Sequence, residues 1–161
     1  MIKVGIAGYG TIGQRLADGV AMQEDMELVG IADLAPTLSI QALRERDMIG
    51  ANGVKYDLYL VDGADKAAFE AKDIPVAGSF DELCQKVDIM LDSAPGGVGA
   101  KNKENYYDKY GVKAIFQGGE KNSVADVFFH GYANYEKGVG QNYLKLTSCN
   151  TTGLIRTVDC L

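Results

Sequence analysis

The glycine-rich stretch Gly8-Tyr9-Gly10-Thr11-Ile12-Gly13 constrains the fold of this chain more than any other segment. It follows directly on the apolar run Ile2 to Ala7, which is typical of a strand buried on both faces in a parallel sheet. Beyond it, Ile12, Leu16 and Val20 recur four residues apart, as on one face of an amphipathic helix. A strand, a glycine turn and a helix in this order predict a dinucleotide-binding unit.

Each glycine of this stretch has a separate expected role. Gly8 allows the tight turn, Gly10 lets a pyrophosphate approach the backbone, and Gly13 permits the helix to pack closely on the strand. Thr11 and Ile12 then offer main-chain N–H groups to the ligand at the start of the helix. A plain strand-to-helix turn is the alternative interpretation, which the flanking pattern disfavours.

Asp33 lies 20 residues after Gly13, at the end of a second apolar run from Met26 to Ala32. A carboxylate at this position can accept hydrogen bonds from the two adenosine ribose hydroxyls. It also repels a 2′-phosphate, so NAD is predicted in preference to NADP, with NADP still possible. A solvent-exposed loop aspartate is the alternative.

Strand-like and helix-like segments alternate along the rest of the chain. The further expected strands are Tyr56 to Val61, Asp88 to Asp92, Val112 to Phe116, Val127 to Ala133 and Tyr143 to Thr147. The further expected helices begin near Pro36 and after Ser79 and cover Lys66 to Lys72, Lys101 to Tyr110 and Ile155 to Leu161. This alternation predicts an α/β fold with a doubly wound, mostly parallel sheet, a Rossmann fold, and 161 residues suit a single domain.

Composition and charge exclude several classes of function. The chain has 16 Lys and Arg against 22 Asp and Glu, a net charge of −6, and no basic tract, so nucleic acid is not an expected partner. Neither a signal peptide nor an apolar run long enough to span a bilayer is recognisable, which predicts a cytoplasmic protein without a membrane partner. The three cysteines lack CxxC spacing, which argues for reduced thiols and against a metal site.

Cys149 is the cysteine with the most distinctive surroundings. It follows the strand-like run Tyr143 to Thr147, and Ser148, Asn150 and Thr151 beside it suit the start of a helix. Free N–H groups and the helix dipole there favour a thiolate and a neighbouring anion. A buried thiol beside an ordinary helix cap is the alternative.

Two other residues are candidates for a role in the chemistry. His130 is the only histidine and could serve as a base for a cysteine, although a single histidine on an expected strand is more often structural. Cys84 falls inside a short expected helix and is predicted to be buried and inert.

Four stretches together resemble the archaeal-type (type II) phosphorylating glyceraldehyde-3-phosphate dehydrogenases. They are the glycine stretch, Asp92-Ser93-Ala94-Pro95, Gln117-Gly118-Gly119-Glu120-Lys121 and Ser148-Cys149-Asn150-Thr151-Thr152-Gly153-Leu154. The resemblance runs in order over the whole chain, and its last two stretches are specific, whereas the glycine stretch is shared by many dehydrogenases.

The resemblance implies a reaction. The Cys149 thiolate attacks the aldehyde carbon of glyceraldehyde 3-phosphate to give a thiohemiacetal, hydride passes to NAD(P), and inorganic phosphate releases the acyl group as 1,3-bisphosphoglycerate. It further implies that Ser148, Asn150 and Thr151 hold the substrate or phosphate. N–H groups at this helix start would stabilise the oxyanion, and Gly119 would contact the dinucleotide together with the glycine stretch.

The chain departs from the family in two respects. Ala32-Asp33-Leu34-Ala35 stands where the family often carries Lys and Thr residues that accept NADP, which favours NAD. The family also continues for a comparable length beyond the cysteine, supplying a histidine base, an arginine and a terminal helix that packs on the first domain. We therefore expect residues 1–148 to form the dinucleotide-binding domain and 149–161 to begin the catalytic helix, in a chain that binds cofactor without turnover.

Three further expectations follow. The complete enzyme is expected to be a homo-oligomer, a tetramer, and an uncovered apolar face predicts self-association or limited solubility of this chain. A different cysteine-dependent enzyme, such as an aspartate-semialdehyde dehydrogenase, is the nearest alternative. A non-catalytic NAD-binding module, in which Cys149 is structural or a redox sensor, is the second.

Overall fold

The computed structural model describes residues 1–158 and 160, and in them eight strands form one sheet. The strands are β1 (Ile2–Ala7), β2 (Met26–Asp33), β3 (Leu58–Leu60), β4 (Gly78–Ser79), β5 (Ile89–Asp92), β6 (Lys113–Phe116), β7 (Val127–Phe129) and β8 (Tyr143–Leu146). Their order across the sheet is β4-β3-β2-β1-β5-β6-β8-β7, and every described pair of strands is parallel. The predicted doubly wound Rossmann fold is confirmed, with a sheet that is parallel throughout.

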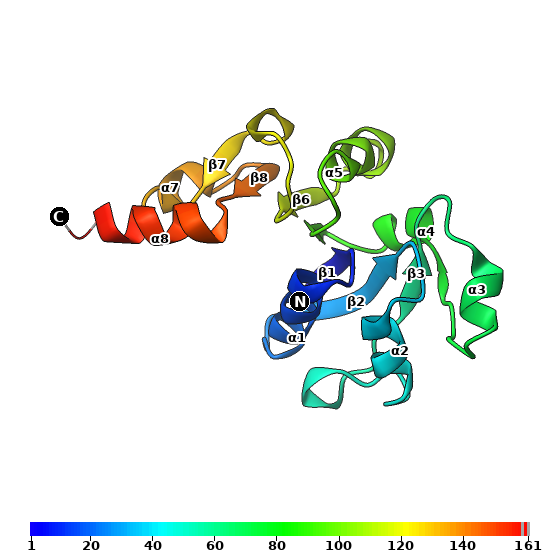
Figure 1. The fold of residues 1–161 in the computed structure, drawn as a ribbon. Helices are drawn as coiled ribbons and strands as arrows, with labels where there is room; N and C mark the ends of the chain where they lie inside the picture. Colours follow the sequence, from blue (N-terminus) through cyan, green and yellow to red (C-terminus); the bar gives the residue numbers. More distant parts are fainter. Residues whose placement is uncertain (159, 161) are drawn as a thin grey trace.

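The direction of the chain reverses beside β1. From β1 it proceeds outward through β2, β3 and β4, and then returns to place β5 on the other side of β1 (Figure 1). The crevice at such a switch point, outside the carboxyl ends of the strands, is where open α/β sheets bind ligands. The glycine turn follows β1 at this point.

The helices cover both faces of the sheet. They are α1 (Thr11–Ala21), α2 (Leu38–Arg44), α3 (Lys66–Glu70), α4 (Phe80–Cys84), α5 (Val98–Asn102), α6 (Asp108–Tyr110), α7 (Tyr135–Gly138) and α8 (Cys149–Val158), with the short turns η1 (Ala51–Gly53) and η3 (Asn122–Val124). A π-helical turn, η2 (Lys103–Tyr107), joins α5 to α6. One apolar core contains side chains of α1, α2 and α3, and a second contains those of α4 and η2.

Local signals account for several of these elements. Ser79 and Glu82 form a capping box at the start of α4, since the Ser79 N–H donates to Glu82 Oε2 at 2.7 Å and the Glu82 N–H donates to Ser79 Oγ at 3.3 Å. The buried line of α1 is Gly13, Ala17 and Val20. The predicted apolar face of Ile12, Leu16 and Val20 is wrong at Ile12, which is about half exposed. The small residues Gly13 and Ala17 face the sheet and let α1 pack closely against it.

Three boundaries differ from the sequence prediction by more than two residues. The strand expected over Val127 to Ala133 ends at Phe129, because the chain turns at His130. The helix expected from Lys101 begins at Val98. The helix expected over Ile155 to Leu161 begins at Cys149 and continues to Val158, while residues 159 and 161 lie outside the described part.

The sheet is long, and its two ends differ in surroundings. β7, α7 and α8 lie at the opposite end of the molecule from α2 and α3 (Figure 1). None of the described helices is both long and apolar enough to cross a membrane.

Candidate functional site

The glycine turn after β1 is shaped by two of its glycines. Gly8 has φ +86°, a left-handed conformation that glycine adopts without strain. Its N–H donates to the Ala32 carbonyl at 2.8 Å, which joins the turn to β2. A Cβ placed on Gly13 would lie 1.9 Å from the Gly8 carbonyl oxygen, so only glycine lets α1 begin this close to β1.

Neither the backbone conformation nor the packing of the protein requires a glycine at position 10. Its φ is −77°, and a Cβ placed on it would meet no protein atom within 4 Å. The space in front of Gly10 is therefore open to a ligand. The start of α1 has no side-chain cap and no acidic residue in its first turn, and Thr11 and Ile12 are exposed there, so its unpaired N–H groups can receive an anion.

Asp33, at the end of β2, contacts this turn directly. The Tyr9 N–H donates to Asp33 Oδ2 at 2.9 Å, and the Leu34 N–H donates to Asp33 Oδ1 at 2.7 Å. The carboxylate therefore braces the glycine turn, and each oxygen retains a lone pair for a further donor.

Ser93 supports the turn from the other side and was not identified from the sequence as a site residue. At the end of β5, its hydroxyl lies 2.7 Å from the Gly8 carbonyl oxygen and 3.1 Å from that of Ala7, and it can donate to either. The polar turn after this strand was a visible signal. Its contact with Gly8 could not be recognised, because it depends on β5 being the neighbour of β1.

A cavity of about 460 Å³ adjoins the glycine turn and Asp33. Its walls come from the carboxyl ends of β1, β2, β3 and β5 and from the helix after β5, and they include Gly8, Asp33, Leu34, Val61, Phe80, Pro95, Val98 and Tyr106. Mostly apolar walls, with polar groups that include the Asp33 carboxylate, suit a flat heterocycle joined to a sugar. The residues present therefore fit the adenosine half of a dinucleotide.

A buried carboxylate lies beneath this cavity. Asp92, the last residue of β5, is 1% exposed and accepts hydrogen bonds from the Ala94 N–H, Asn102 Nδ2 and the Tyr107 hydroxyl at 3.0, 2.9 and 2.7 Å. Burial raises the pKa of Asp92, against the lowering effect of these donors. The network joins the turn after β5 to the helix that follows.

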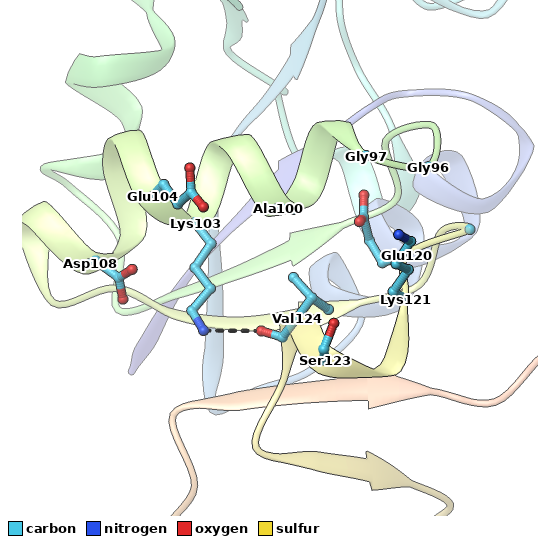
Figure 2. A pocket seen from close by; sticks show the side chains of 11 residues that line it. Gly96, Gly97, Ala100, Lys103, Glu104, Asp108, Glu120, Lys121, Ser123 and Val124 are labelled. Carbon is cyan, nitrogen blue, oxygen red and sulfur yellow. Dashed lines mark hydrogen bonds between the residues drawn. The ribbon is translucent and has the colours of Figure 1, made fainter.

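A second, larger cleft of about 810 Å³ lies between this helix and the loop after β6 (Figure 2). Gly119 lies on its wall with side chains of both charges, including Lys103, Glu104 and Lys121. Glu120 accepts a hydrogen bond from the Gly99 N–H at 2.8 Å, so its carboxylate occupies the start of α5.

Cys149 is exposed at the first residue of α8, after the end of β8. Ser148 caps this helix, since the Thr151 N–H donates to its hydroxyl at 3.2 Å and the Thr152 N–H donates to its carbonyl at 2.8 Å. The N–H groups of Cys149 and Asn150 have no hydrogen-bond partner among the residues that the structure describes. Two donors of the first turn thus remain available beside the sulfur.

The other candidate residues have structural environments. His130 is buried in the turn after β7, where its N–H donates to Asn134 Oδ1 at 2.8 Å and its Nδ1 accepts from the Tyr132 N–H at 3.2 Å. Cys84 is buried as predicted, and burial raises the pKa of its thiol to about 12.

The structure brings most of the predicted site residues to one edge of the sheet. The glycine turn and Asp33 are in contact, and a Cβ on Gly96, after β5, would lie 2.9 Å from the Gly119 carbonyl oxygen. Cys149 follows β8, which is three strands from β1, or roughly 14 Å at the usual strand spacing. The fold and the turn define a Rossmann domain, with an exposed thiol farther along the same edge.

Comparison with known proteins identifies the relatives of this domain. The chain is 45% identical over 160 residues to the glyceraldehyde-3-phosphate dehydrogenase of Archaeoglobus fulgidus, 46% over 159 residues to that of Methanobacterium bryantii, and 47% over 160 residues to that of Thermococcus kodakarensis. Each alignment covers 99% of this chain. The chain is therefore homologous along nearly its whole length to archaeal glyceraldehyde-3-phosphate dehydrogenases, and the resemblance inferred from the four stretches is confirmed.

The chain spans less than half the length of these relatives, 44% or 45%. No protein-family model matches it. Among solved structures, it is similar to aspartate semialdehyde dehydrogenase with NADP from Candida albicans, with a TM-score of 0.58, 14% identity, and coverage of 99% of this chain and 46% of that one. Aspartate semialdehyde dehydrogenase II from Vibrio cholerae gives a TM-score of 0.54 at 18% identity, with coverage of 99% and 45%. At these identities the structural likeness shows the fold alone.

Proposed function

We propose that this chain is the cofactor-binding part of a phosphorylating glyceraldehyde-3-phosphate dehydrogenase and that it binds NAD along the carboxyl edge of its sheet. Gly10 carries the proposal. Neither its backbone angles nor its neighbours require a glycine, yet a glycine stands where the start of α1 faces open space. A ligand that approaches the backbone at this point explains the residue.

The two ends of the cofactor are assigned by the surroundings of the turn. The adenosine half would occupy the apolar cavity beside Asp33, and the pyrophosphate would lie over Gly8, Gly10 and Gly13 at the start of α1, near the Thr11 and Ile12 N–H groups. The nicotinamide half then extends across the ends of β5 and β6, past Gly119, toward Cys149. The bound nicotinamide supplies the hydride acceptor of the reaction.

Asp33 supports NAD as the preferred cofactor. Its two oxygens already accept main-chain N–H groups and can accept ribose hydroxyls with their remaining lone pairs. A 2′-phosphate would bring a second negative group against this carboxylate.

Cys149 is the proposed nucleophile. Its exposed sulfur would add to the aldehyde carbon, and the oxygen of the resulting thiohemiacetal could accept from the Cys149 and Asn150 N–H groups. The Ser148 and Thr151 hydroxyls lie 2.9 Å apart and form a small polar surface beside the sulfur. We assign them, with the Asn150 amide, to holding substrate or inorganic phosphate.

The division of the chain follows from the same assignment. We assign residues 1–148 to the dinucleotide-binding domain, and Cys149 to the start of the helix that carries the nucleophile, whose described part ends at Val158. Among the described residues no hydrogen bond joins a histidine to Cys149, and we expect cofactor binding without turnover. The predicted self-association of this chain, and a tetramer for the complete enzyme, can be checked by light scattering.

Calorimetric titration of the chain with NAD and NADP tests the cofactor assignment. Saturable binding of NAD, tighter than that of NADP, is expected, and undetectable binding of both would overturn the proposal.

Alkylation with iodoacetamide, followed peptide by peptide, tests the nucleophile. Cys149 is expected to react faster than Cys160, which is also exposed, and far faster than buried Cys84. Equal rates at Cys149 and Cys160 would remove the chemical argument for Cys149. They would favour the non-catalytic NAD-binding module instead.

An aspartate-semialdehyde dehydrogenase is the nearest alternative. The structural likeness to such enzymes is of fold alone, at 14% and 18% identity, whereas identity to the three glyceraldehyde-3-phosphate dehydrogenases compared above is 45% to 47%. Oxidation of glyceraldehyde 3-phosphate but not aspartate semialdehyde by a full-length protein containing this segment would decide between them.

A further inference from the structure

Lys145 is a buried lysine within the sheet, on β8, that the reaction outlined above does not use. It is 7% exposed and shares a face of the strand with buried Tyr143. Among the described residues no carboxylate forms an ion pair with it. Burying an ammonium group without a counter-charge is costly, so packing alone does not explain a lysine at this position.

The ammonium group connects the ends of two neighbouring strands. Lys145 Nζ donates to the Gly118 carbonyl at 2.9 Å and to the Leu146 carbonyl at 3.0 Å. Gly118 lies in the loop after β6, and Leu146 is the last residue of β8. Lys145 therefore ties the loop that carries Gly119 to the segment that leads into Cys149.

The same loop is held on its other side by close backbone packing. A Cβ placed on Gly118 would lie 2.2 Å from the carbonyl oxygen of Ala94, which follows Ser93 in the turn after β5. Because Ser93 contacts Gly8, the strand ends from the glycine turn to β8 form one connected series. Lys145 is the link at the Cys149 end of that series.

We propose that Lys145 is a positioning residue that sets the separation between Gly119 and Cys149, and so shapes the part of the groove that receives nicotinamide. This inference rests on the proposed function. The residues that line the adenosine cavity come from the ends of β1, β2, β3 and β5 and from the helix after β5, and the loop that Lys145 holds is not among them, so we expect the cavity to keep its shape when the Lys145 link is removed. Lys145 therefore affects the two halves of the cofactor unequally.

Calorimetry with NAD and with ADP-ribose, which lacks nicotinamide, measures this inequality. In Lys145→Met, NAD is expected to bind about tenfold more weakly, the loss that corresponds to a hydrogen bond from a charged group. ADP-ribose is expected to bind within about twofold of the unaltered chain. Lys145→Arg, whose fork can donate to both carbonyls, should restore NAD binding to within about threefold.

Lys113→Met is the matched control, because Lys113 is an exposed lysine on the adjacent strand β6 and its loss changes the net charge equally. It should bind both ligands as the unaltered chain does. If Lys145→Met does not fold, Lys145→Gln replaces it with the same expected pattern.

Equal weakening of NAD and ADP-ribose would show that Lys145 only supports the fold, and unchanged binding of both would show that it positions nothing. Either result overturns this inference and leaves the proposed function standing. Absence of NAD binding to the unaltered chain would instead overturn the proposed function, and this inference with it.

Discussion

The main-chain N–H of Tyr9 donates a 2.9 Å hydrogen bond to the carboxylate of Asp33, so the residue expected to select the cofactor also supports the turn that is expected to bind it. The two roles can be separated by substitution. Asparagine keeps an acceptor for the Tyr9 N–H and removes the negative charge, whereas lysine removes the acceptor as well.

Asp33→Asn should therefore narrow the difference between the affinities of the chain for NAD and for NADP. NAD affinity is expected to fall by about three- to tenfold, because a charged acceptor becomes neutral, while NADP affinity rises relative to it. Asp33→Lys should weaken both cofactors because the turn loses its brace. Titrations of each variant with both cofactors measure this, and an undiminished preference in Asp33→Asn would contradict the assigned role.

Substitutions of the glycines in the turn should affect the stability of the fold and the binding of NAD separately. Gly13→Ala places a Cβ 1.9 Å from the Gly8 carbonyl oxygen and should lower the free energy of unfolding by about 3 kcal/mol or more. Gly10→Ala meets no neighbour and should change it by less than about 1 kcal/mol, yet abolish tight NAD binding. Gly19→Ala, in the exposed interior of α1, is the control that should stabilise by about 1 kcal/mol without affecting NAD. Urea unfolding and calorimetry supply both measurements, and normal NAD binding by Gly10→Ala would refute the role of that glycine.

Tyr107→Phe should lower the free energy of unfolding by more than the removal of one oxygen atom suggests. The Tyr107 hydroxyl donates to buried Asp92 at 2.7 Å, and its loss leaves a buried carboxylate short of a donor, at a cost of about 1.5–3 kcal/mol. Tyr110→Phe is the control, since its hydroxyl donates to Asp81 at the same distance nearer the surface and should cost about 0.5 kcal/mol. Equal losses in urea unfolding would argue against a special contribution from Asp92.

The raised pKa of Asp92 predicts a pH dependence of opposite sign to that of most carboxylates. In the unfolded state Asp92 has the ordinary carboxyl pKa of 3.8, whereas the folded state holds the proton more tightly and so has a higher pKa. Ionisation of Asp92 therefore lowers the stability of the fold as the pH rises from 3.8 through the raised pKa. Below 3.8 this penalty is absent.

The comparison of the unaltered chain with Asp92→Asn isolates this effect from other carboxylates. As pH falls toward 4, the stability of the unaltered chain should increase relative to that of the variant. Urea unfolding across this range measures the difference, and a pH-independent difference would show that Asp92 titrates alike in both states.

Much of the fold could be predicted because its signals are local. The apolar run before Gly8, the glycine spacing and the position of Asp33 lie within one strand–turn–helix–strand segment, and the structure has these elements at nearly the expected residues. The sequence pattern predicts His130 on a strand, but that strand ends one residue earlier, at Phe129. Its hydrogen bonds to Tyr132 and Asn134, which form the turn, were not visible as periodicity.

The contacts that support the site could not be predicted in the same way. Lys145 lies in a strand whose apolar and polar residues alternate, and nothing in that pattern indicates that its side chain is buried. The residue that accepts its hydrogen bond, Gly118, is 27 residues away in the sequence. Ser93 is 85 residues from Gly8. Such contacts depend on which strands become neighbours, and strand order results from the packing of helices on both faces.

By itself, the sequence determined that a glycine turn follows a buried strand and that an acidic residue ends the next one, because backbone sterics and hydrophobic periodicity act over a few residues. The tertiary structure alone decided that Asp33 and Ser93 brace that turn from two sides. It also decided that Lys145 joins the loop of Gly119 to the approach to Cys149, since hydrogen bonds form only between groups that the completed sheet brings within reach.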